Sequence, residues 1–126
     1  MSCGNKTHIV TGSDRIIISP NYPNKYPGGL DCEMLLLVET GTIVAIQFLN
    51  FSVEPGRVYG CWDWIDIYDG NNSNADALKS RLCGNNFEKT VLATQNSMFI
   101  TFKSRIGGTR GFFRFRIMNG KNISYI

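Results

Sequence analysis

The segment C-W-D-W-I-D-I-Y-D-G, residues 61–70, indicates the fold class of this chain. Ile65 and Ile67 alternate with the large side chains of Trp64 and Tyr68, which predicts a β-strand with one of the two sets facing the core. The Asp-Gly pair that ends the segment predicts a turn. Two cysteines, Cys61 and Cys83, bracket this strand and the loop after it.

The rest of the chain is predicted to be strand and turn. β-Branched and aromatic residues, separated by turn residues, predict further strands at 16–19, 33–38, 43–48, 98–103 and 112–118. A change of phase in the apolar alternation predicts a bulge near Phe48 or Leu49, and Glu39-Thr40-Gly41 predicts a hairpin turn. No stretch has helical periodicity, so we expect a sandwich of two antiparallel sheets.

The composition is that of a single small domain. The chain has 126 residues, and 43% of them are hydrophobic, which suffices for one core. We expect one domain over residues 1–118 and a C-terminal tail over 119–126. No apolar run approaches the ~20 residues that a membrane-spanning helix needs.

The four cysteines indicate disulfides rather than a metal site. They form no C-x-x-C pair, and His8 is the only histidine, so the usual spacing of zinc ligands is missing. Two disulfides imply an oxidising compartment, although four cysteines alone leave three pairings open. Four N-x-S/T motifs also favour a secreted glycoprotein. The candidate glycosylation sites are Asn5, Asn50, Asn71 and Asn122.

Several further segments carry a resemblance to a known family. They are C-G at 3–4, S-P-N-Y-P-N-K-Y-P at 19–27, F-L-N-F-S-V-E at 48–54, L-C-G at 82–84, N-S-M-F-I-T-F-K-S at 96–104 and G-F at 111–112. In this order, and together with residues 61–70, they resemble a CUB domain from Cys3 to about Ile117. The resemblance implies an extracellular CUB-type β-sandwich with the disulfides Cys3–Cys32 and Cys61–Cys83, each stabilising the fold by roughly 3 kcal/mol.

The resemblance also implies where a calcium ion would bind. Many CUB domains hold calcium with a glutamate before the third cysteine, an aspartate two residues after it, and an acid after the Phe-x-Ser strand. Glu54 and Asp63 match the first two, whereas Arg105 stands in place of the third acid. A fixed cation removes a ligand and repels the ion, so we expect no calcium and no other cofactor. The Arg105 guanidinium is expected either between Glu54 and Asp63 or in solvent.

The charge distribution suggests which partners the chain could bind. The formal net charge is +3, and no acidic residue follows Glu88. Arg114 and Arg116 alternate with apolar residues, so they are predicted on an outer sheet face that either attracts sulfated glycans or acidic proteins or is simply solvated. Exposed tyrosines and tryptophans are further candidate anchors. The candidates for partner binding are Tyr22, Tyr26, Tyr59, Trp62, Arg105, Arg110, Arg114 and Arg116.

The sequence offers little for catalysis. With His8 as the only histidine and the cysteines oxidised, nucleophilic catalysis has no base, and no phosphate-binding loop occurs. We therefore expect a non-catalytic module that recognises an extracellular protein or a sulfated glycan, rather than nucleic acid. It is expected to be part of a larger secreted or cell-surface protein. The alternatives are a free-standing, spermadhesin-like glycan binder and, in another class, a small secreted hydrolase.

Overall fold

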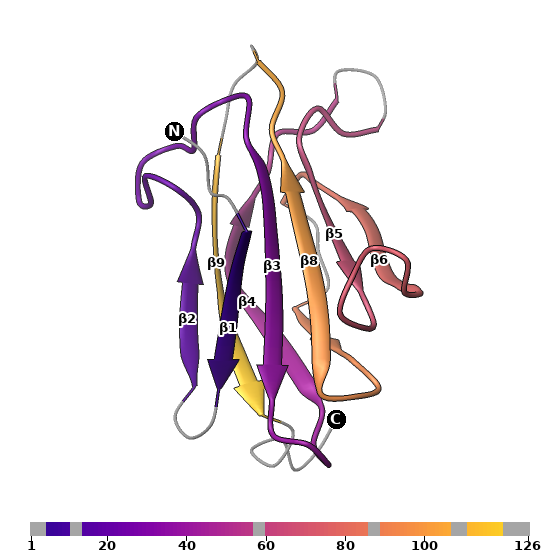
Figure 1. Cartoon of the computed structure of the whole chain (residues 1–126). Helices are drawn as coiled ribbons and strands as arrows, with labels where there is room; N and C mark the ends of the chain where they lie inside the picture. The colour runs from indigo at the N-terminus through magenta and orange to yellow at the C-terminus, as the bar shows by residue number, and fades with distance from the viewer. Residues whose placement is uncertain (1–4, 11–13, 57–59, 86–88, 107–110, 120–126) are drawn as a thin grey trace.

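The computed structural model describes residues 5–10, 14–56, 60–85, 89–106 and 111–119. Within these ranges the chain forms nine β-strands and no helix (Figure 1). The strands are β1 (Asn5–Val10), β2 (Arg15–Ile18), β3 (Asp31–Val38), β4 (Val44–Ser52), β5 (Trp64–Tyr68), β6 (Ala77–Leu82), β7 (Thr90–Leu92), β8 (Ser97–Lys103) and β9 (Phe112–Asn119). None of the described segments is a helix able to cross a membrane.

The strands form two sheets, in the order β1-β3-β8-β5-β6 and β2-β9-β4-β7 (Figure 1). The expectation of two purely antiparallel sheets is wrong at one place, because β1 runs parallel to β3. A parallel pair needs a long crossover connection. Here the chain between β1 and β3 includes β2, which lies in the other sheet.

The core lies between the two sheets and follows the predicted alternation. Ile65 and Ile67 of β5 are fully buried, while Trp64 and Tyr68 lie on the outer face. In β9, Phe113, Phe115 and Ile117 are buried in the same way, and the residues between them are only partly buried. Apolar burial of this kind supplies most of the free energy that holds a small sandwich together.

Two predicted irregularities occur near β4. The register with β9 shifts between Phe48 and Asn50, which confirms the bulge. After β3 the chain turns, and the Thr42 N–H donates to the Glu39 carbonyl oxygen at 3.1 Å. However, β3 and β4 belong to different sheets, so this turn joins the two layers and is not a hairpin turn.

One disulfide is fully described. Cys61 and Cys83 are bonded, with their Cα atoms 5.8 Å apart. Cys32 also has no free thiol. Cys3 lies outside the described residues, so the Cys3–Cys32 pairing stays a prediction. The last strand, β9, ends at Asn119, one residue beyond the predicted domain boundary, and residues 120–126 lie outside the described part.

Candidate functional site

The residues of interest gather at the end of the sandwich where β8 ends and β5 begins, at the top of Figure 1. A buried carboxylate organises this end. Asp63 is fully buried, and its Oδ2 atom accepts a hydrogen bond from the Tyr26 hydroxyl at 2.7 Å. Its Oδ1 atom accepts one from the main-chain N–H of Arg105 at 2.8 Å. Asp63 therefore links the loop around residue 26, the start of β5 and the segment after β8.

Tyr26 completes this network. Its hydroxyl oxygen also accepts a hydrogen bond from the main-chain N–H of Glu54 at 3.1 Å. Burial raises the pKa of Tyr26 far above its ordinary value, and the hydrogen bond to Asp63 acts in the same direction, so the hydroxyl stays a donor. Because only 1% of Tyr26 is exposed, the expectation that it anchors a partner is wrong. Its ring instead packs edge-on against Phe102.

Of the two arrangements expected for Arg105, between the acids or in solvent, the exposed side chain is closer to the second. Its guanidinium makes no ion pair with Glu54 or Asp63 among the described residues. The guanidinium carbon instead lies 5.4 Å from the ring centroid of Trp62 and 5.4 Å from that of Trp64. The main chain of Arg105 already satisfies one oxygen of Asp63, and the exposed side chain is stabilised by the faces of the two indoles.

Arg81 also lies against this pair of indoles, although it was not among the residues predicted from the sequence. Its guanidinium carbon is 4.1 Å from the ring centroid of Trp64. The register between β5 and β6 shifts near this residue, since Ile65 pairs with Leu82 but Ile67 pairs with Lys79. A bulge of this kind re-aims a side chain.

The main chain of Arg81 is held in an unusual conformation. Its φ is +51°, a region that non-glycine residues rarely adopt. The Arg81 N–H donates to Oδ1 of Asp66 at 2.8 Å, and the Cys61 sulfur lies 3.2 Å from the Arg81 carbonyl oxygen. Strained residues held in place by their surroundings are concentrated at functional sites.

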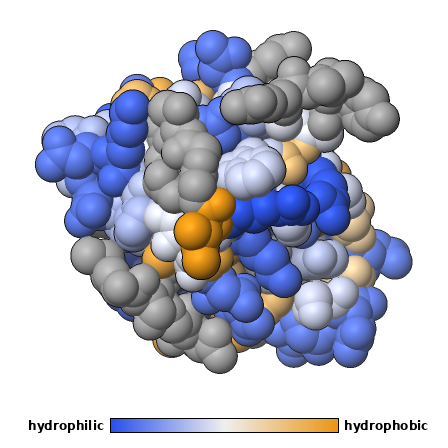
Figure 2. Space-filling model, turned by 90° about the horizontal axis from the view of Figure 1, so that it is seen from above, coloured by the Kyte–Doolittle hydropathy of each residue, from blue (hydrophilic) through white to orange (hydrophobic). Residues whose placement is uncertain are grey.

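We call Trp62, Trp64, Arg81 and Arg105 the Arg–Trp stack. Each cation–π contact at an exposed site contributes about 0.5–1 kcal/mol, enough to hold a long side chain in one place. Within the described part of the chain, neither guanidinium donates a hydrogen bond to a side chain or forms an ion pair. Their N–H groups are therefore available to a ligand. Seen from this end, the surface is largely hydrophilic with small hydrophobic groups (Figure 2).

The residues at this end do not fit a calcium ion. Calcium prefers six to eight oxygen ligands, several of them anionic. Both oxygens of Asp63 already accept hydrogen bonds, and a cationic residue, Arg105, follows the strand where the third acid is expected. No group of three or more His, Cys, Asp or Glu side chains in the described ranges is placed to hold a metal.

Arg114 and Arg116 lie elsewhere, on the outer face of the four-stranded sheet. As predicted, they face away from the buried side chains of β9. Arg116 is already engaged, because its Nη1 donates to Gln47 at 3.4 Å and its Nε lies 4.0 Å from the Asp14 carboxylate. Arg114 pairs in register with Asn50 and Ile18. The structure therefore separates these two arginines from the Arg–Trp stack.

The other candidates are scattered. Tyr22 is half-buried, and its hydroxyl donates to Oδ1 of Asn50 at 3.0 Å. Of the candidate glycosylation sites, Asn50 is half-buried on β4 and Asn71 is exposed in the turn after β5, while Asn5 lies on β1. Three further candidates lie outside the described residues: Tyr59, Arg110 and Asn122.

The comparisons with known proteins agree with this architecture. The family described as "CUB domain" matches residues 3–116. Cubilin from Sus scrofa is 30% identical over 109 residues, which cover 86% of this chain and 3% of cubilin. Tolloid-like protein 1 from Homo sapiens is 32% identical over 102 residues, which cover 81% of this chain and 10% of that protein. The chain thus spans only a small part of these curated relatives.

Solved structures show the same fold. The CUB2 domain of MASP-1 bound to Ca²⁺ superposes with a TM-score of 0.72 at 28% identity, covering 87% of this chain and 96% of that one. The full extracellular region of zebrafish Gpr126/Adgrg6 gives a TM-score of 0.76 at 27% identity, covering 95% of this chain and 15% of that one. The match to the family extends over nearly the whole chain, and the chain belongs to the CUB domain family.

Proposed function

We propose that this CUB domain is a non-catalytic extracellular recognition module that binds acidic groups of its partner through the Arg–Trp stack. The observation that carries the proposal is the pair of guanidiniums, Arg81 and Arg105, that lie against indoles and have no acidic partner among the described residues. A guanidinium presents a planar fork of N–H groups that matches a carboxylate or a sulfate. Holding the fork in place before binding reduces the conformational entropy that binding would cost.

An extracellular setting is supported by two findings. The disulfide Cys61–Cys83 is typical of an oxidising compartment, and one solved structure with this fold is an extracellular region. The relatives are much longer than this chain, which supports the proposal that the domain is part of a larger secreted or cell-surface protein. A free-standing, spermadhesin-like glycan binder is the alternative.

A hydrolase is not supported by the placement of the ionisable groups. His8 lies on β1 and the Arg–Trp stack involves β5 and β6, toward the opposite edge of the five-stranded sheet. The carboxylate of Asp63 is fully buried and already accepts two hydrogen bonds, so it is not free to act as a base or a nucleophile. The placement of these residues fits a surface that recognises a partner better than it fits a catalytic site.

The proposed recognition does not use calcium. In CUB domains that bind calcium, the ion organises an acidic edge, whereas the corresponding edge here presents the guanidinium of Arg105. We therefore propose a partner with carboxylates or sulfates: an acidic extracellular protein or a sulfated glycan. Calcium should change neither the melting temperature of the domain nor its affinity for such a partner.

Heparin chromatography of two matched variants tests the proposal. Arg81→Gln with Arg105→Gln removes two positive charges from the stack, and Arg114→Gln with Arg116→Gln removes two from the sheet face. Electrostatic attraction by net charge alone would shift both variants equally. We expect the stack variant to elute at clearly lower salt than the control variant, with or without EDTA. Equal shifts, or a larger shift for the control, would refute the assignment of the binding surface.

A further inference from the structure

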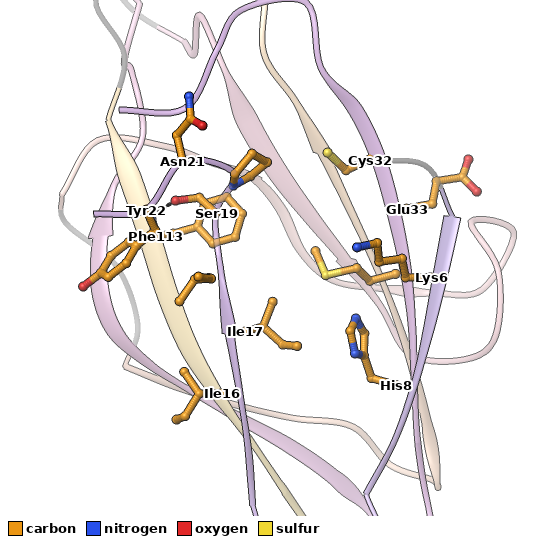
Figure 3. A pocket seen from close by; sticks show the side chains of 13 residues that line it. Lys6, His8, Ile16, Ile17, Ser19, Asn21, Tyr22, Cys32, Glu33 and Phe113 are labelled. Atoms are coloured by element: carbon orange, nitrogen blue, oxygen red, sulfur yellow. Dashed lines mark hydrogen bonds between the residues drawn. The ribbon is translucent and has the colours of Figure 1, made fainter. Parts of the chain in front are cut away.

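A second site lies between the two sheets, at the edge of the sandwich formed by β1 and β2. Here a cleft of about 420 Å³ opens between the edge strands of the two sheets (Figure 3). Within the described residues β1 pairs only with β3, and β2 only with β9, so the space between these two edges is not closed by a further strand. The volume falls within the range of roughly 300–1,000 Å³ that is usual for small-molecule sites.

The inner wall of the cleft is apolar. Met34 and Phe113 line it and are 8% and 2% exposed, so they belong to the core of the sandwich. Ile17 lines the side formed by β2 and packs against the same core (Figure 3). The apolar chain of a ligand placed here would contact these side chains, most of whose surface is already shielded from water.

The mouth of the cleft is cationic. Side chains at alternate positions of a strand share one face, and Val10 of β1 is buried in the core. Lys6 and His8 therefore face the same space between the sheets, and Figure 3 shows both on the β1 side of the cleft. Within the described ranges neither side chain has a hydrogen-bond or ion-pair partner.

No carboxylate of the described residues balances these groups inside the cleft. Among the described residues, Glu33 is the only acidic one that lines the cleft, but its neighbours on β3, Cys32 and Met34, are buried, so Glu33 faces the outside of the sheet. Figure 3 shows its carboxylate pointing away from the other side chains. Burial is the main reason why the pKa of His8 is lowered, and the positive charges of Arg15 and Lys6 act in the same direction.

We propose that this cleft binds an amphipathic carboxylate: a small molecule with one anionic head and an apolar chain. The head would accept hydrogen bonds from Lys6 and His8, and the chain would lie on the Met34 side of the cleft. Charge complementarity selects the acid over a neutral or cationic molecule with the same chain. The inference is independent of the Arg–Trp stack, because β1 and β6 are opposite edges of the five-stranded sheet.

Titration with dodecanoate below its micelle concentration, followed by amide NMR, tests this site in the whole chain. We expect saturable shifts at residues 6–8, 16–18 and 32–34, with dodecanol binding more weakly and dodecyltrimethylammonium not binding there. Lys6→Met keeps the length of the side chain and removes its charge, so it should weaken dodecanoate at least about fivefold. Lys25→Met, on an exposed loop outside the cleft, should leave the affinity unchanged.

Three outcomes would overturn the proposal. The first is the absence of shifts at the cleft with dodecanoate, and the second is equal binding of dodecanol. The third is a Lys6→Met variant that binds dodecanoate normally but self-associates. In that case the role of Lys6 is to prevent strand pairing between molecules, as an inward-facing lysine on an edge strand can do. The comparison of the three wild-type titrations decides the matter even if the variant does not fold.

Discussion

Replacing Tyr26 with phenylalanine removes a single oxygen atom from the network at the end of the sandwich. The ring would stay packed against Phe102, at a centroid distance of 4.9 Å. The buried carboxylate of Asp63 would lose a hydrogen bond of 2.7 Å, and the main-chain N–H of Glu54 would lose its acceptor. A hydrogen bond to a charged group contributes about 1.5–3 kcal/mol, and an unsatisfied N–H adds about 1 kcal/mol. Tyr26→Phe should therefore lower the free energy of unfolding by about 2.5–4 kcal/mol.

Urea unfolding followed by circular dichroism measures this loss, and the m-value should stay unchanged because the fold is the same. Tyr22→Phe is the matched control, since it removes one hydrogen bond between neutral groups, from Tyr22 to Asn50. The control should cost only about 0.5–1.5 kcal/mol. If Tyr26→Phe costs less than about 1 kcal/mol, or no more than the control, Asp63 does not organise this end in the way described.

Three further predictions follow from single features. A Cβ atom at Gly111 would overlap the carbonyl oxygen of Ser52, so Gly111→Ala should destabilise the domain by about 2 kcal/mol or more; an unchanged melting temperature would contradict this. Joint replacement of Cys61 and Cys83 by serine opens a loop with a sequence separation of 22 and should cost about 3 kcal/mol in urea unfolding. The pKa of His8 is lowered from 6.5, so the folded state binds fewer protons than the unfolded state. The free energy of unfolding should therefore fall as the pH decreases through about 6.5, and His8→Gln should flatten that part of the profile.

The sequence predicted the strands that are rich in β-branched and aromatic residues, which are β2, β3, β4, β5, β8 and β9 among the described residues. In β5 and β9 the inward-facing residues recur with a period of two, as the burial of Ile65, Ile67 and Phe115 reflects. β1, β6 and β7 were not predicted. The sequence N-K-T-H-I-V of β1 is largely polar, and it becomes a strand because it pairs with β3 over its whole length. Pairing between distant segments is not visible in local sequence.

The candidate site was predicted only in part. Arg105 was predicted from the resemblance to the CUB family, and Trp62 was predicted as an exposed aromatic anchor. Arg81 was missed, since its position over Trp64 depends on a bulge and on a positive φ that no residue type signals. Tyr26 lies in a proline-rich segment that looks like a surface loop, yet its ring is buried because Asp63 satisfies the hydroxyl.

The intrinsic fluorescence of the domain tests its proposed function most directly, because Trp62 and Trp64 are its only two tryptophans and both belong to the Arg–Trp stack. Titration with a sulfated oligosaccharide or an acidic peptide should give a saturable change in emission, equal in EDTA and in calcium. High salt should weaken it. Arg105→Gln should lower the affinity about tenfold, whereas Arg114→Gln should not. Emission that does not change with either ligand, that changes only with calcium, or that responds equally in the Arg105→Gln variant would contradict the account.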